Sequence, residues 1–76
     1  MTAFDVELDT SGQNCPMPIM HCKKALHKME SGQVLHLIAT DPGSRDDIPQ
    51  LVLQINCKVI DSDIADGNYH FYIQKN

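Results

Sequence analysis

The fold is decided by residues 15–32, Cys-Pro-Met-Pro-Ile-Met-His-Cys-Lys-Lys-Ala-Leu-His-Lys-Met-Glu-Ser-Gly. Two prolines at the start of this stretch favour a helix that begins at Pro16, because proline is tolerated in a first helical turn. Apolar side chains then recur with the helical period and predict a helix over residues 16–30, with Gly32 as its left-handed cap. The predicted buried face of this helix consists of Ile19, Cys22, Leu26 and Met29.

Strands are predicted on both sides of this helix. Residues 4–9 alternate apolar and acidic side chains, which is the two-residue period of a strand with one buried face. Residues 34–40 form a mostly apolar strand, and residues 58–64 and 69–75 form a hairpin around Ala-Asp-Gly-Asn.

A second helix is predicted between the second and third strands. Asp46 is the expected N-cap, because a start there places Pro49 in the first turn, where no intrahelical N–H is needed. Asn56 is the expected left-handed end of this helix. Its apolar stripe consists of Ile48, Leu51, Val52 and Ile55.

The order of these elements, βαβαββ, predicts an α/β (α+β) two-layer sandwich in a single domain over residues 1–76. We expect a mixed four-stranded sheet with both helices on one face. The first two strands run parallel if they are neighbours, and the hairpin strands are antiparallel. The pattern does not give the strand order.

Composition narrows the classes of function. With 76 residues, the chain has room for one thin core and not for a deep substrate cavity. A net charge of −4 argues against wrapping a nucleic-acid backbone, and no apolar run approaches the length of a membrane span. Three cysteines without paired spacing and no visible secretory signal predict free thiols in the reducing cytoplasm.

Cys15 is the candidate reactive residue, because it is expected at the N-cap of the first helix. The N–H groups of Met17 and Ile19 would point at its sulfur, and a helix N-terminus lowers the pKa of a thiol there. Pro16 and Pro18 stiffen the turn. The competing interpretation is that Cys15 is an inert structural residue in a regulatory or interaction module, and the pattern leaves it open.

Other chemistries have weaker support. The chain has no Cys-x-x-Cys pair, so dithiol exchange lacks its second thiol, and no glycine-rich phosphate loop. Cys22 belongs to the apolar stripe, and Cys57 is expected in a buried position or a turn. His36 and His70 are expected to be half-exposed sheet residues, and no metal or cofactor is expected. A zinc site formed by Cys15, His21, Cys22 and His27 has little support, because the spacing is unlike that of zinc fingers.

Two motifs then resemble the TusA/SirA family of sulfur-carrier proteins. The first runs Leu-Asp-x-x-Gly-x-x-Cys-Pro-x-Pro over residues 8–18, followed by Lys-Lys-Ala-Leu at residues 23–26 and by Gly32. The second runs Thr-Asp-Pro-Gly-Ser-x-x-Asp-Ile-Pro over residues 40–49. The two motifs follow in the family's order, and the resemblance covers nearly the whole chain.

The resemblance implies a persulfide relay. Cys15 would accept a sulfane sulfur from a cysteine desulfurase and pass it to a downstream acceptor protein, with thiolation of a tRNA wobble uridine as one destination. A carrier that exposes one turn to two partners is expected to be a monomer. Docking candidates are Lys23 and His27, where the tRNA-linked member has arginine, and Asp41 and Asp47 of the second motif. That member has an acidic residue in place of Met17. A third interpretation, an RNA-binding domain, lacks a basic face.

Overall fold

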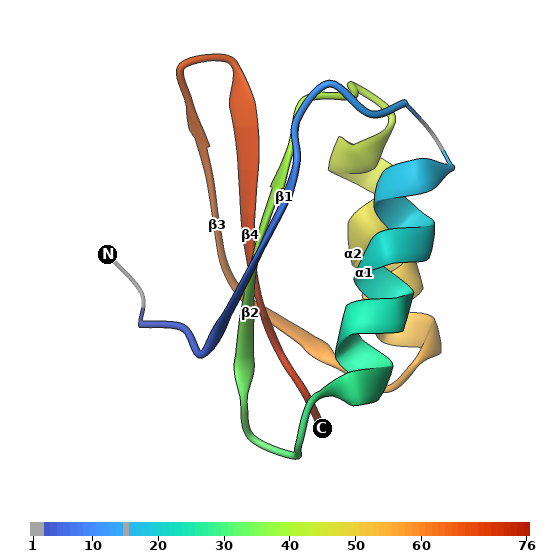
Figure 1. The fold of residues 1–76 in the computed structure, drawn as a ribbon, viewed down its shortest axis with the longest axis vertical. Coiled ribbons are helices and arrows are strands. Elements are labelled where there is room, and N and C mark those ends of the chain that lie inside the picture. Colours follow the sequence, from blue (N-terminus) through green and yellow to red (C-terminus); the bar gives the residue numbers. More distant parts are fainter. Residues whose placement is uncertain (1–2, 15) are drawn as a thin grey trace.

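The computed structural model describes residues 3–14 and 16–76 (Figure 1). Two helices lie together against one side of a four-stranded sheet, so the molecule has two layers. In chain order the elements are β1 (Val6–Thr10), α1 (Met17–Lys28), β2 (Val34–Ala39), α2 (Ser44–Gln54), β3 (Lys58–Ala65) and β4 (Asn68–Gln74). This is the expected βαβαββ sandwich.

The sheet has the strand order β1-β2-β4-β3, which the sequence pattern left open. β1 and β2 are parallel, and β4 is antiparallel to both β2 and β3. The C-terminal strand therefore lies in the middle of the sheet, and β1 and β3 form its edges. The expected parallel and antiparallel pairs are both confirmed.

The core lies between the helices and the sheet, and it is built from the predicted apolar stripes. Cys22 and Leu26 of α1 are fully buried, as are Ile48 and Val52 of α2. Ile19 and Ile55 are half-buried and pack against this core. The sheet contributes Leu35, Leu37, Phe71 and Ile73.

Positive φ angles occur at the predicted turn residues. Asn56, directly after α2, has φ +60° and is the predicted left-handed end of that helix. Gly32 has φ +89°, but it does not cap α1, because the helix ends at Lys28, before the predicted Glu30, and Met29 is an extended C-cap. In the hairpin, Asp66 and Gly67 have φ +53° and +78°, the two left-handed residues that a tight β3–β4 connection needs.

The predicted start of the second helix is wrong. α2 begins at Ser44, with Gly43 as its N-cap, so Pro49 lies inside the helix and not in its first turn. The earlier start comes from a tight first turn, in which Arg45 N–H donates to the Pro42 carbonyl at 3.3 Å and Asp46 N–H donates to the Gly43 carbonyl at 3.3 Å. These bonds extend the helix before the proline, at the cost of the hydrogen bond that Pro49 cannot donate.

The first helix also begins one residue later than expected. Pro16 is its N-cap, so Met17 and Pro18 occupy the first two helical positions. The prediction that Cys15 is the N-cap is therefore wrong, because Pro16 occupies that position; Cys15 itself lies outside the described residues. Pro18 is buried in the first turn, where its missing N–H costs no helical hydrogen bond.

Candidate functional site

Both helices begin at the same end of the molecule (Figure 1). Because β1 and β2 are parallel neighbours, their C-terminal ends lie at the same end of the sheet. The β1–α1 connection and the β2–α2 connection therefore lie side by side. The N-termini of α1 and α2 therefore add their partial positive charges at this end. The two family-like motifs, separate in the sequence, meet here.

Hydrogen bonds join the two connections. Gly12 N–H, in the β1–α1 connection, donates to the Thr40 hydroxyl oxygen at 2.8 Å, and Gly12 has φ +81°. The buried Thr10 hydroxyl donates to the Ile38 carbonyl across the strands. Sequence reasoning missed Thr10, the last residue of β1, and it included Thr40 in the second motif without predicting this contact.

The segment around residue 15 is held on both sides. Met17 N–H donates to the Asn14 carbonyl at 2.9 Å, and Met20 N–H donates to the Pro16 carbonyl at 3.0 Å. The expectation that Met17 N–H is free for a sulfur at Cys15 is therefore wrong, because a turn across residues 14–17 uses it. Cys15 itself, and any bond to it, lies outside the described residues.

Asp41 and Asp47 flank Gly43 at the start of α2. A Cβ atom on Gly43 would lie 3.0 Å from Asp41 Oδ2 and 3.5 Å from Asp47 Oδ2, so both carboxylates approach this backbone closely. Carboxylates are favoured at a helix N-terminus. The structure therefore places these two predicted docking residues together at the start of α2.

Several buried polar atoms at this end have no hydrogen-bond partner among the described residues: Gln13 Oε1, Asp41 Oδ2 and Ser44 Oγ. Buried polar groups without partners are uncommon in native proteins and call for a specific explanation. Gln13 lies in the β1–α1 connection, and Asp41 and Ser44 lie at the start of α2. All three fall in or beside the two motifs.

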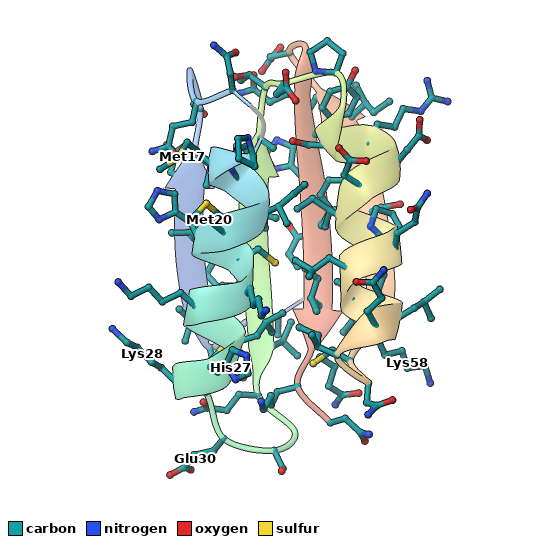
Figure 2. The ribbon with its side chains drawn as sticks, turned by 90° about the vertical axis from the view of Figure 1, so that its right-hand side faces the viewer. Met17, Met20, His27, Lys28, Glu30 and Lys58 are labelled. Atoms are coloured by element: carbon teal, nitrogen blue, oxygen red, sulfur yellow. The ribbon has the colours of Figure 1, made fainter. Side chains whose placement is uncertain are left out.

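The surface of α1 changes along its length (Figure 2). Met17 and Met20, at its N-terminal end, expose 42% and 57% of their surface. Lys23 and His27 are also exposed. Each helical residue rises by about 1.5 Å, so His27 lies about 15 Å along the α1 axis from Met17. A partner that contacts both residues therefore needs a wide interface.

The two described cysteines are core residues, as predicted. Cys22 is fully buried, and this burial, together with the nearby Cys57, raises the pKa of its thiol to about 12. Cys57 is 6% exposed, and its thiol faces the Ile55 carbonyl at 3.7 Å. At neutral pH the Cys22 thiol is therefore protonated, and both thiols lie below the surface of the folded chain.

The expectation that His36 is half-exposed is wrong, because only 8% of its surface is accessible. Its Nε2 lies 2.9 Å from Nδ1 of the half-buried His70, and its ring stacks on Tyr72. Within residues 3–14 and 16–76, no three His, Cys, Asp or Glu side chains are grouped to hold a metal ion. No helix in this part of the chain has the length and apolar character needed to cross a membrane.

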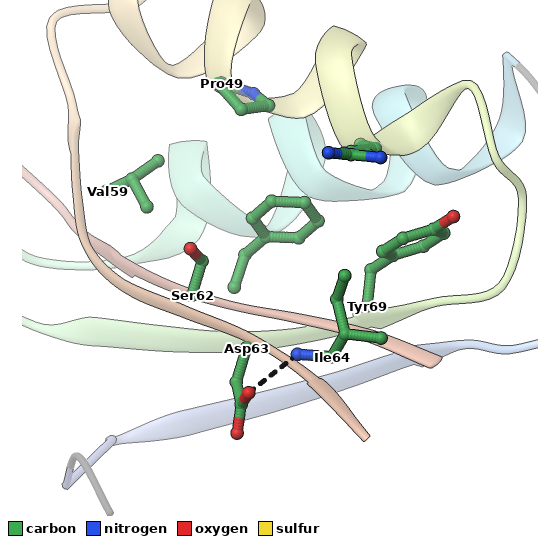
Figure 3. A pocket seen from close by; sticks show the side chains of 8 residues that line it. Pro49, Val59, Ser62, Asp63, Ile64 and Tyr69 are labelled. Carbon is green, nitrogen blue, oxygen red and sulfur yellow. Dashed lines mark hydrogen bonds between the residues drawn. The ribbon is translucent and has the colours of Figure 1, made fainter. Parts of the chain in front are cut away.

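A groove of about 510 Å³ lies between α2 and the β3–β4 hairpin (Figure 3). Pro49 of α2 and Val59, Ile64 and Tyr69 of the hairpin line it, and Ile64 N–H donates to Asp63 Oδ1 at 2.8 Å. None of the described residues that were predicted for the site lines this groove. The groove is therefore separate from the candidate site at the helix starts.

Comparison with known proteins gives a family match. The family model described as "Sulfurtransferase TusA" matches residues 6–75. A "Sulfur carrier protein TusA" from Allochromatium vinosum is 51% identical over 75 residues, which cover 99% of each chain. A protein of the same name from Pseudomonas fluorescens is 36% identical over 72 residues, covering 95% of this chain and 87% of that one.

A solved structure agrees with the fold. The crystal structure of a SirA-like protein from Desulfitobacterium hafniense matches this chain with a TM-score of 0.83 at 25% sequence identity. The match covers 92% of this chain and 96% of that one. The predicted two-layer α/β architecture is thereby confirmed by an independent structure.

Proposed function

Because this chain belongs to the TusA family, we propose that it is a sulfur carrier that holds sulfane sulfur as a persulfide on Cys15. A cysteine desulfurase would load the sulfur, and a downstream acceptor protein would take it. The chain acts as a sulfurtransferase in this relay. The observation that carries the proposal is the burial of Cys22 and Cys57, which leaves Cys15 as the cysteine for chemistry with partner proteins.

The location of the Cys15 segment supports this role. The neighbours of Cys15 in the sequence are held by hydrogen bonds, since the Asn14 carbonyl accepts from Met17 N–H and the Pro16 carbonyl accepts from Met20 N–H. Two helices start at this end, and their dipoles favour an anionic sulfur over a neutral thiol. A persulfide held here would therefore be kept in its nucleophilic form.

The transfer is balanced without an external oxidant. The Cys15 thiolate attacks the outer sulfur of the donor's persulfide, and a new S–S bond forms on Cys15. The S–S bond on the donor breaks, and the donor cysteine leaves as a thiolate. Delivery repeats these steps, with the acceptor thiolate attacking the outer sulfur on Cys15.

We assign partner docking to the surface around this end. Exposed Met17 and Met20 supply apolar area, and Lys23 and His27 extend the contact along α1. Asp41 and Asp47 supply negative charge on the other side, at the start of α2. Opposite charges on the two sides would orient a partner. A destination in tRNA 2-thiouridine synthesis is the first pathway to test.

The deciding experiment is intact-protein mass spectrometry after incubation with a cysteine desulfurase, its cofactor and cysteine. We expect one added sulfur on the wild type and on Cys57→Ser, removed by reductant, and none on Cys15→Ser. Loading of Cys15→Ser, or no loading of the wild type, would favour the interaction module with a structural Cys15.

Docking is tested by charge reversal. Lys23→Glu should slow loading, whereas Lys58→Glu, an equal charge change on β3, should not. Lys58 lies away from the start of α1 (Figure 2). Equal loading rates for the two variants would remove Lys23 from the docking surface.

A further inference from the structure

The sheet face opposite the helices carries an ordered arrangement of aromatic rings and carboxylates. The proposed sulfur transfer through Cys15 does not involve these side chains. Leu35 and Leu37 of β2 point into the core, so His36 and Ile38, between and after them, point to the opposite face. Paired residues in neighbouring strands share a face. The register of the four strands therefore defines which side chains stand together on this helix-free face.

Two parallel rows run across all four strands. The first is Glu7–His36–Tyr72–Asp61, and the second is Asp9–Ile38–His70–Asp63. Each row starts and ends with an exposed carboxylate and has rings or apolar side chains at its centre. With strands about 4.8 Å apart, the carboxylates of one row stand about 14 Å from each other.

The centre of this face is a packed ring cluster. His36 and Tyr72 stack with ring centroids 4.5 Å apart, and Phe4 packs on His36 at 4.9 Å. His36 Nε2 and His70 Nδ1 share a hydrogen bond of 2.9 Å, which requires one nitrogen to act as an acceptor and so to be unprotonated. Phe4 leaves 41% of its surface accessible above this cluster.

The charge of the face is negative at neutral pH. Burial and the neighbouring His70 lower the pKa of His36, against an opposite effect of Glu7, so His36 is neutral there. The Ser11 hydrogen bonds, and in smaller measure His70, lower the pKa of Asp9. Among the four described strands the single lysine or arginine is Lys58, at the far end of β3 beside Gln74.

A groove of about 410 Å³ opens on this face between the rings and β3. Asp61, Asp63, His70 and Tyr72 contribute to its walls. Both carboxylates accept a hydrogen bond from the next backbone N–H. Ser62 N–H donates to Asp61 Oδ1 at 2.9 Å, and Ile64 N–H donates to Asp63 Oδ1 at 2.8 Å. The groove therefore joins oriented negative charge to aromatic surface.

We propose that this helix-free face docks a partner segment bearing arginine. A guanidinium group pairs with carboxylates through several N–H donors and also stacks on aromatic rings, whereas an ammonium group does only part of this. Nucleic acids and anionic membranes are repelled by the four carboxylates, and so is the same face of a second copy. This surface is on the opposite side of the sheet from the helices, so the docking does not depend on Cys15 chemistry.

The test uses the full chain and NMR titration with two capped peptides, one with arginine and one with lysine at alternate positions. We expect the arginine peptide to bind more tightly and to shift amides of β2, β3 and β4. Asp61→Asn/Asp63→Asn should weaken its binding about five-fold. The matched control Glu30→Gln/Asp46→Asn removes the same charge outside the sheet, from the α1–β2 connection and from α2, and should have little effect.

A second variant keeps the test independent of strand stability. Phe4 lies outside the strands, and Phe4→Ala removes exposed ring surface. This substitution should therefore also weaken binding of the arginine peptide. Equal affinity for the two peptides, equal weakening in the control variant, or shifts confined to α1 would overturn the proposal. Self-association in sedimentation, abolished by Asp61→Asn/Asp63→Asn, would also overturn it in favour of a second copy.

Discussion

The three cysteines should differ sharply in their rates of alkylation, and the magnitude follows from the burial of Cys22. With a pKa of about 12, the Cys22 thiol is ionised to about one part in 10⁴ at about pH 8. A thiol of ordinary pKa, about 8.5, is ionised to about one quarter at the same pH. Ionisation alone therefore makes Cys22 slower than an ordinary cysteine by a factor of about 10³.

Unfolding sets a second route to the buried thiols. A domain whose free energy of unfolding is about 5 kcal/mol is unfolded for about two parts in 10⁴ of the time. Alkylation through the unfolded state therefore proceeds at about 10⁻⁴ of the rate of an exposed thiol. The two routes give similar limits for Cys22. Cys57, with 6% of its surface accessible, should react through opening of the chain as well.

The assay is a time course with iodoacetamide, read by intact mass and by peptide mapping. We expect the native wild type to gain one adduct, on Cys15, about 10³ times faster than a second. Cys15→Ser should gain none on that timescale, and concentrated urea should make all remaining thiols react alike. Comparable rates at Cys15 and Cys22 in the native chain would refute this reasoning.

Three further predictions concern stability, measured by urea unfolding followed by circular dichroism. Leu26→Ala should lower the free energy of unfolding by about 2–5 kcal/mol, because this fully buried side chain leaves a cavity; a loss below about 1 kcal/mol would contradict its place in the core. Gly67→Ala should cost about 1–2 kcal/mol from its φ of +78° alone, since no atom lies within 4 Å of the added Cβ, and an unchanged midpoint would argue against this turn. Lowering the pH from about 7.5 to about 5.5 should reduce stability, because the unfolded chain binds a proton at about 6.5 whereas the pKa of folded His36 is lower; His36→Phe should show less of this loss, and an equal loss in both would contradict it.

The sequence determined the elements because each is encoded in local spacing. The stripe through Cys22 and Leu26 predicts a helix with one buried face, and that face is the one the core uses. Left-handed positions were also local, since Gly32 and Asn56 are residue types that accept positive φ. The two motifs were sufficient to indicate the family.

Local rules failed at both helix starts. Asp46 was expected as an N-cap because Pro49 would then cost nothing, but hydrogen bonds of the Asp41–Gly43 connection begin α2 at Ser44. Met17 N–H was expected to be free, but the Asn14 carbonyl accepts it. Where a helix begins depends on which neighbouring backbone groups form hydrogen bonds with one another. Residue preference alone does not decide this position.

Only the tertiary structure decided what comes together. The order β1-β2-β4-β3 places the last strand between two others, and no local pattern specifies which edges pair. That order aligns Glu7, His36, Tyr72 and Asp61 in one row, although they come from four separate strands. It also brings the Gly12 and Thr40 connections into contact. Spacing along the chain encodes periodicity within an element, whereas contacts between elements depend on how their faces pack.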